Sequence, residues 1–124
     1  MLSMAVLSIK EIISDQNLAT LPGSASVAEA VALMQERTIR CILVTDGNAL
    51  LGVFTETDAN RLLAVTNKSE KRQLEEVMTP LPVTITKSTS PADALDLMAR
   101  GEFKHLPVVE DGALIGIVSR RDFF

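Results

Sequence analysis

The sequence is poor in aromatic residues. Its 124 residues include no tryptophan, no tyrosine and only 4 phenylalanines, although 47% of the residues are hydrophobic. The core must therefore be built from aliphatic side chains and methionine, which are residue types often found fully buried. A chain of this length forms one compact unit or two very small ones.

Features that several classes of protein require are also missing. Cys41 is the only cysteine, which excludes an internal disulfide and a zinc site of several cysteines. The formal net charge is −4 and no run of basic residues occurs, which argues against nucleic acid or an anionic membrane as the main partner. The apolar start, residues 1–13, lacks the basic segment of a signal peptide, and no stretch is long and apolar enough to span a bilayer. We therefore expect a soluble cytoplasmic protein.

What the sequence does contain is an internal repeat. Residues 26–60 align with residues 90–124 at an offset of 64 without a gap, and ten positions are identical. Two copies are too few for a solenoid, which needs about three stacked units. We therefore expect two half-modules that pack about a pseudo-twofold axis.

Each copy begins its first helix with the same type of cap. Ser26 and Glu29 form a capping-box pattern, in which hydroxyl and carboxylate accept from free backbone N–H groups. Ser90 and Asp93 give the related pattern in copy two, with Pro91 at the first helical position, where its missing N–H costs nothing. Apolar residues then recur at helical spacing after both caps.

Extended segments surround this helix in both copies. The dipeptides Asp46-Gly47 and Asp111-Gly112 predict tight turns, because both residue types tolerate positive φ. A second helix is expected over 55–65, and its counterpart in copy two is truncated at Phe124. The predicted extended segments are 19–21, 41–45 and 49–54 in copy one, and 82–86, 106–109 and 113–118 in copy two.

A short helix precedes each copy. Leu74, Val77 and Met78 form the apolar face of the helix that ends the charged linker 66–80, and residues 7–13 play the same part before copy one. The order of elements predicts a mixed α/β fold. The whole chain, 1–124, is then a single module with repeat 1 over residues 7–66 and repeat 2 over residues 70–124.

The corner between the last strand and the last helix allows two interpretations. Thr55 is followed three residues later by Asp58, and Ser119 by Asp122. Each pair can be a capping box that starts a helix. Each can also receive a ligand, because a helix N-terminus and a hydroxyl suit a phosphate, and a carboxylate can accept from ribose hydroxyls. The residue types alone leave both interpretations open.

Four further residues bear on the choice between a ligand site and a structural role. Gly52 and Gly116 have no Cβ, so that a ligand or a strand can come close to them. Cys41 lies in an apolar strand and is most simply a small core residue. His105 has no second histidine and no acidic cluster at metal-ligand spacing, which favours a cleft-lining or half-buried residue over a catalytic or metal-binding one.

The complete pattern resembles the cystathionine-β-synthase (CBS) domain, and the tandem pair resembles the Bateman module. The resemblance implies clefts between two CBS repeats that bind adenine nucleotides or related adenosine ligands, a flat homodimer and a regulatory function without catalysis. It covers nearly the whole chain. The segments that carry it are SVAEAVALM (26–34), GVFTETD (52–58), VMTPLPVTI (77–85), SPADALDLM (90–98), KHLPVVEDG (104–112) and GIVSRRD (116–122).

The resemblance also implies a set of binding residues for each cleft. Asp58 and Asp122 would hold ribose, and Thr55 and Ser119 would touch phosphate. The implied copy-two cleft consists of Ala25, Ala30, Lys104, His105, Ile117, Ser119, Arg120, Arg121 and Asp122, and the copy-one cleft of Val53, Thr55, Thr57, Asp58, Thr89 and Ala94.

The two clefts differ in charge. Copy two has Arg120 and Arg121 between hydroxyl and aspartate, where copy one has Glu56 and Thr57. Arginine matches phosphate with fixed, charged donors, whereas glutamate would repel it. We therefore expect the copy-two cleft to bind an anionic adenine nucleotide more tightly.

The sequence thus predicts a non-enzymatic regulatory sensor for AMP, ADP or ATP that requires no cofactor and forms a homodimer. An unidentified effector protein is a further expected partner. The alternative from another class is a ligand-free module for dimerisation or protein docking. Phe123 and Phe124 are expected to be exposed and to pack into the dimer interface.

Overall fold

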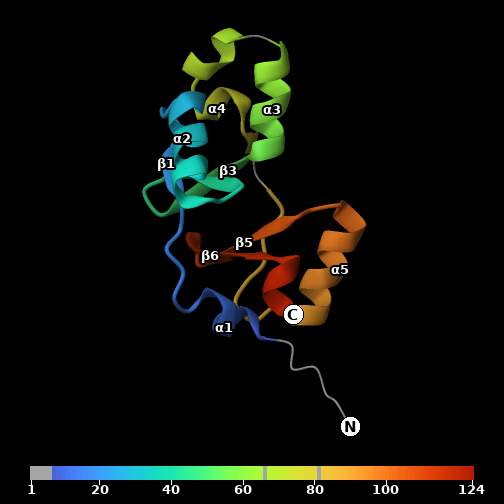
Figure 1. The fold of residues 1–124 in the computed structure, drawn as a ribbon. Coiled ribbons are helices and arrows are strands. Elements are labelled where there is room, and N and C mark those ends of the chain that lie inside the picture. The colour runs from blue at the N-terminus through green and yellow to red at the C-terminus, as the bar shows by residue number, and fades with distance from the viewer. Residues whose placement is uncertain (1–6, 66, 81) are drawn as a thin grey trace. The chain divides into compact units, whose positions relative to one another are not determined.

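The computed structural model describes residues 7–65, 67–80 and 82–124. These form two compact units, one over Ala19–Pro82 and one that joins residues 7–18 to Val83–Phe124. We call them the repeat-1 unit and the repeat-2 unit (Figure 1). Residues 1–6, 66 and 81 lie outside the described residues. They include part of the predicted apolar start, the last residue of predicted repeat 1 (Thr66) and one residue of the segment 77–85 (Leu81). Among the described residues, no helix combines the length and apolar character needed to cross a bilayer.

The repeat-1 unit is built on a sheet of four strands in the order β1-β2-β3-β4, in which β1 and β2 are parallel and the other pairs antiparallel. Its apolar core includes Val27, Met34, Ile42, Phe54 and Leu74. Within this unit, α2 and α3 cover the same face of the sheet (Figure 1). The elements are β1 (Thr20–Pro22), α2 (Val27–Arg37), β2 (Cys41–Asp46), β3 (Ala49–Thr55), α3 (Glu56–Val65), η1 (Asn67–Lys71), α4 (Leu74–Val77) and β4 (Thr79–Pro80).

The repeat-2 unit is built on the antiparallel pair β5-β6. The predicted extended segment 82–86 contributes only an isolated parallel bridge, between Ile85 and Val108. Phe123 is 1% exposed and packs in the core of this unit, so the expected exposure is wrong for Phe123, whereas Phe124 is 67% exposed. The elements are α1 (Ile9–Ile13), α5 (Pro91–Gly101), β5 (His105–Glu110), β6 (Ala113–Ser119) and η2 (Arg120–Phe123).

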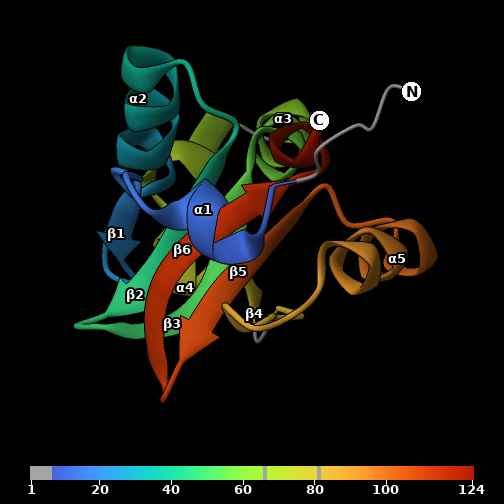
Figure 2. The ribbon, with the colours of Figure 1, turned by 90° about the horizontal axis from the view of Figure 1, so that it is seen from below.

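The units do not follow the sequence repeats, because the short preceding helices are exchanged. Helix α1 comes first in the chain but packs on β6 in the repeat-2 unit, where Ile9 is fully buried (Figure 2). Helix α4 lies at the start of predicted repeat 2 but packs in the repeat-1 unit through Leu74, Val77 and Met78, the apolar face predicted from the sequence.

The two hairpins share their register at the offset of 64. Both have a shift in strand pairing, between Val44 and Thr45 in one and between Val108 and Val109 in the other. Asp111-Gly112 forms the predicted turn, with positive φ at both residues. The first turn is Gly47-Asn48 rather than Asp46-Gly47, because Asp46 still pairs with Ala49 in the ladder.

The serine half of each predicted helix cap is present. The hydroxyl of Ser26 accepts from the backbone N–H of Glu29, at 3.1 Å, but the carboxylate of Glu29 does not accept from the backbone N–H of Ser26. Ser90 accepts from the backbone N–H of Asp93 in the same way, with Pro91 in the first turn as predicted.

Candidate ligand-binding corners

The repeat-1 corner joins β3 to α3. Its last strand residue is Thr55, whose backbone N–H donates to Oδ2 of Asp58 at 2.9 Å. The backbone N–H of Asp58 donates in return to the hydroxyl of Thr55 at 3.2 Å. Both partners are half-buried. This reciprocal pair is a capping box, so the structural interpretation of the motif holds here.

The repeat-2 corner joins β6 to the single turn η2. Oδ2 of Asp122 accepts from the backbone N–H of Ser119 at 2.7 Å and from its hydroxyl at 3.2 Å. Asp122 therefore fixes the corner just as Asp58 does. In the described part of the chain neither Oδ1 atom accepts a hydrogen bond, so one oxygen of each carboxylate is left without a partner there.

One residue of the preceding strand stands opposite each corner. Cys41 pairs with Thr55 in the β2-β3 ladder, and His105 pairs with Ser119 in the β5-β6 ladder. Burial, reinforced by the nearby Asp58, raises the pKa of the Cys41 thiol to about 12. A thiol with such a pKa stays protonated and unreactive at neutral pH, in agreement with a core role.

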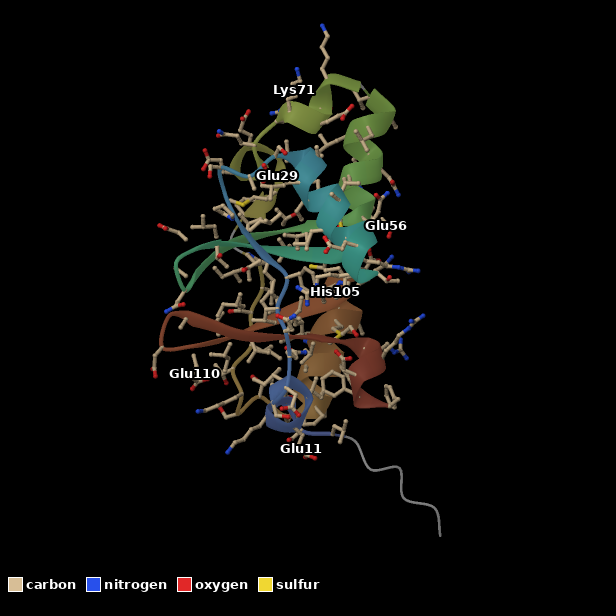
Figure 3. The ribbon with its side chains drawn as sticks, turned by 60° about the vertical axis from the view of Figure 1, so that its left-hand side comes forward. Glu11, Glu29, Glu56, Lys71, His105 and Glu110 are labelled. Carbon is tan, nitrogen blue, oxygen red and sulfur yellow. The ribbon has the colours of Figure 1, made fainter. Side chains whose placement is uncertain are left out.

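His105 is half-buried at the start of β5 (Figure 3). Burial lowers the pKa of its imidazole, because a charged ring is poorly solvated there. Asp122 opposes this effect by attracting the protonated form, and Lys104 adds to it by repelling that form.

The charged side chains around the two corners differ as the sequence predicts. At the repeat-1 corner Arg40 and Glu56 approach each other to 3.8 Å, so that the arginine faces an acid (Figure 3 labels Glu56). At the repeat-2 corner Lys104, Arg120 and Arg121 are exposed. Among the described residues none of these three has an acidic partner within salt-bridge distance.

The remaining predicted residues divide between the two units. Ala25 and Ala30 are buried in the repeat-1 core, and Ala94 is buried in the repeat-2 core. The hydroxyl of Thr89 accepts from the backbone N–H of Thr86 at 3.1 Å. The repeat-1 unit also holds Val53, Thr55, Thr57 and Asp58, and the repeat-2 unit holds Lys104, His105, Ile117, Ser119, Arg120, Arg121 and Asp122.

A residue that the sequence analysis missed lies beside the repeat-2 corner. The side-chain amide of Gln16 donates to the carbonyl oxygen of Ile117 at 2.6 Å and accepts from its backbone N–H at 2.9 Å. At the equivalent edge of the other unit, β4 pairs with β3 at Gly52 and Val53. The amide of Gln16 therefore replaces a strand. The offset of 64 was the available signal, because it aligns Gln16 with Pro80 of β4.

The two corner glycines are explained by the same contacts. A Cβ at Gly116 would lie 2.4 Å from a side-chain carbon of Ile13 in α1, and a Cβ at Gly52 would lie 2.5 Å from the carbonyl oxygen of Thr79. The sequence left open whether a ligand or a protein segment approaches these glycines. In both units a segment of the chain itself occupies the space.

Comparison with known proteins identifies the family to which this chain belongs. The CBS domain family matches residues 9–65 and 74–124, and the chain therefore belongs to the CBS domain family as a tandem pair. The mixed α/β fold predicted from the repeats is likewise confirmed by solved CBS-domain structures.

Three relatives define the match more closely. The CBS-domain containing protein ATU1752 from Agrobacterium tumefaciens has a TM-score of 0.85 and 28% identity, over 94% of this chain and 95% of that one. CBSX2, solved in complex with AMP, has a TM-score of 0.74 and 34% identity, over 86% and 84%. The Arabidopsis thaliana CBS domain-containing protein CBSCBSPB5 is 39% identical over 80% of this chain, which spans only 18% of that relative.

Proposed function

We propose that this protein is a regulatory module that binds an adenine nucleotide such as AMP, with the stronger site at the repeat-2 corner. The observation that carries the proposal is the set of exposed basic side chains, Lys104, Arg120 and Arg121, beside Ser119 and Asp122. The complex of CBSX2 with AMP, at 34% identity, supports the choice of ligand.

Each part of the corner has a role in this proposal. Oδ1 of Asp122 accepts hydrogen bonds from the ribose hydroxyls while Oδ2 continues to hold Ser119. The three basic side chains bind the phosphate, and the two guanidinium groups do so with fixed forks of donors. Binding of this kind needs no catalytic step, and the module acts by favouring the conformation that holds the ligand.

The repeat-1 corner is the weaker site in this proposal. Asp58 offers the same free oxygen for ribose, but Glu56 occupies the place of Arg120 and faces Arg40. A phosphate would have to compete with Glu56 for that arginine. The carboxylate would also repel it, so a phosphorylated ligand gains less at this corner.

Calorimetric titration with AMP tests the proposal on a matched pair of variants. Asp122→Asn and Asp58→Asn remove the same charge from equivalent caps, so their effects on folding are comparable. We expect Asp122→Asn to weaken AMP binding at least about tenfold, as expected for a lost charged hydrogen bond. Asp58→Asn should leave the stronger binding event unchanged. The reverse result would contradict the ranking, and wild-type protein that binds no AMP would contradict the proposed function.

A second function is favoured by a separate observation. A groove of about 550 Å³ lies between α2 and α3 of the repeat-1 unit, and its lining combines apolar side chains, including Val31, Ile39 and Leu63, with polar ones, including Arg40 and Glu56 of the repeat-1 corner. Leu63 is 36% exposed and Val65, near the end of α3, is 82% exposed. We propose that a second copy of the chain covers this groove in a homodimer, because an exposed apolar surface gains free energy when it is buried.

A further inference from the structure

We infer that His105 takes up a proton when the repeat-2 corner binds a phosphate-bearing adenosine compound. As a result the corner prefers phosphorylated over unphosphorylated ligands more strongly as the pH falls toward the ordinary histidine pKa of about 6.5. The inference rests on the proposed function, because it concerns the same corner and the same class of ligand.

The position of His105 in the ladder is the first step of the argument. It pairs with Ser119, and Ser119 in turn holds Asp122 through two hydrogen bonds of 2.7 and 3.2 Å. The imidazole therefore belongs to the residue pair that forms the corner. Lys104 precedes it directly in the chain, so a phosphate held by that lysine and by η2 would lie within the electrostatic reach of His105.

Burial and the charges around His105 determine its protonation state in the free protein. Burial lowers the pKa of the imidazole below its ordinary value, Asp122 opposes this and Lys104 adds to it. The neutral form of His105 is therefore favoured when no ligand is bound. The charged residues near His105 come from β5, its neighbours in the chain and the elements that surround it: Lys104 directly before β5, Glu110 of β5, Asp93, Asp96 and Arg100 of α5, Arg120, Arg121 and Asp122 of η2, and Lys87 next to the Ile85 bridge.

These surroundings offer little further negative charge to stabilise an imidazolium. Asp96 is paired with Arg100 at 3.0 Å, and Glu110 accepts from the backbone N–H of Lys87 at the far end of β5. A bound phosphate supplies the missing negative charge, because an anion near a histidine favours the protonated form and raises its pKa. Binding and protonation then strengthen each other equally. Adenosine brings no charge and has no such effect.

Repeat 1 provides a control within the same chain. Cys41 occupies the position of His105 beside Asp58, and its thiol, with a pKa of about 12, does not change its charge near neutral pH. Proton uptake should therefore accompany binding at the repeat-2 corner and not binding at the repeat-1 corner.

The test uses the fact that His105 is the only histidine in the sequence. In protein without a histidine tag, the imidazole C–H signals in a proton NMR spectrum belong to His105 and report its pKa without any substitution. We expect this pKa to lie below the ordinary value in the free protein, to rise in the presence of saturating AMP, and to remain unchanged with adenosine.

Calorimetry on His105→Gln completes the experiment. The measured quantity is the AMP affinity of wild-type protein divided by that of His105→Gln. This ratio should rise as the pH is lowered, by at most about tenfold per pH unit, which is the limit for one linked proton. Because both proteins meet the same ligand, the titration of the AMP phosphate cancels in this ratio. The inference is overturned if AMP binds and the pKa of His105 does not rise, or if adenosine raises it equally, and the proposed function then stands. If AMP does not bind at all, the proposed function and the inference both fail.

Discussion

Phe123 and Ala59 occupy equivalent positions of the two repeats, but Phe123 carries an aromatic ring that Ala59 lacks. Phe123 is 1% exposed and belongs to the core of the repeat-2 unit, where η2 packs against α5. Ala59 lies at the corresponding contact of α3 with α2, and it lines the open groove. The equivalent positions therefore hold a large buried side chain in one unit and a small buried side chain beside the groove in the other.

We expect Phe123→Ala to lower the free energy of unfolding of the repeat-2 unit by about 3–5 kcal/mol, because a buried ring is lost and a cavity remains. Phe124→Ala is the matched control, since Phe124 is 67% exposed and its loss should cost less than about 0.5 kcal/mol. Urea denaturation followed by circular dichroism measures both. Equal effects of the two substitutions would show that Phe123 does not pack as described.

Single residues also show where prediction from the sequence reaches its limit. Thr55 with Asp58 and Ser119 with Asp122 were predicted as caps or as ligand contacts, and the structure confirms the caps. The pattern could not decide between the two roles, because a cap and a nucleotide site use the same hydroxyl and the same carboxylate. Because the Oδ1 atoms accept no hydrogen bond in the described part of the chain, the capping role is compatible with the proposed ligand contact, which stays a prediction.

At the scale of elements, the internal repeat predicted the hairpins and the helices well, because both copies carry the same apolar spacing and the same caps. It did not predict which sheet each short preceding helix would cover. Helix α1 has only five residues, and a short apolar helix of this kind can pack on either hairpin. The hairpin on which α1 packs depends on contacts between residues far apart in the chain, such as Ile13 with Gly116 and Gln16 with Ile117.

The substitution Gln16→Ala tests the most specific of these contacts. It removes both hydrogen bonds to the backbone of Ile117, and we expect a loss of about 1–2 kcal/mol in unfolding free energy. Amide hydrogen exchange at Ile117, followed by NMR, should become markedly faster. Gln16→Glu is the matched control, because its carboxylate can still accept from the N–H of Ile117 but cannot donate to the carbonyl oxygen. Unchanged exchange in Gln16→Ala would show that the amide does not replace a strand.

At the scale of the whole molecule, duplication has produced two units with the same frame and different surfaces. The repeat-2 corner carries basic side chains without acidic partners among the described residues, whereas the repeat-1 corner carries an ion pair. The repeat-1 unit instead exposes the groove between α2 and α3. The stronger proposed nucleotide site and the proposed self-association surface therefore lie in different units, so that substitutions can separate them.

Self-association through the groove can be tested with two substitutions that act in different ways. Leu63→Glu places a charge at the edge of the groove, and Ala59→Phe adds a ring at a position that lines it. We expect sedimentation velocity to show a dimer for wild-type protein and a shift to monomer, by at least about tenfold in the dissociation constant, for both variants.

Val83→Glu is the matched control, because Val83 is 40% exposed, close to the 36% of Leu63, but lies in the other unit. It should leave the dimer intact. Since neither groove substitution touches the repeat-2 corner, both variants should still bind AMP. Dimers that persist in both groove variants would place the contact elsewhere on the chain, and a monomeric wild-type protein would contradict the homodimer itself. A loss of AMP binding together with the dimer would show that the two tasks are coupled and not separable.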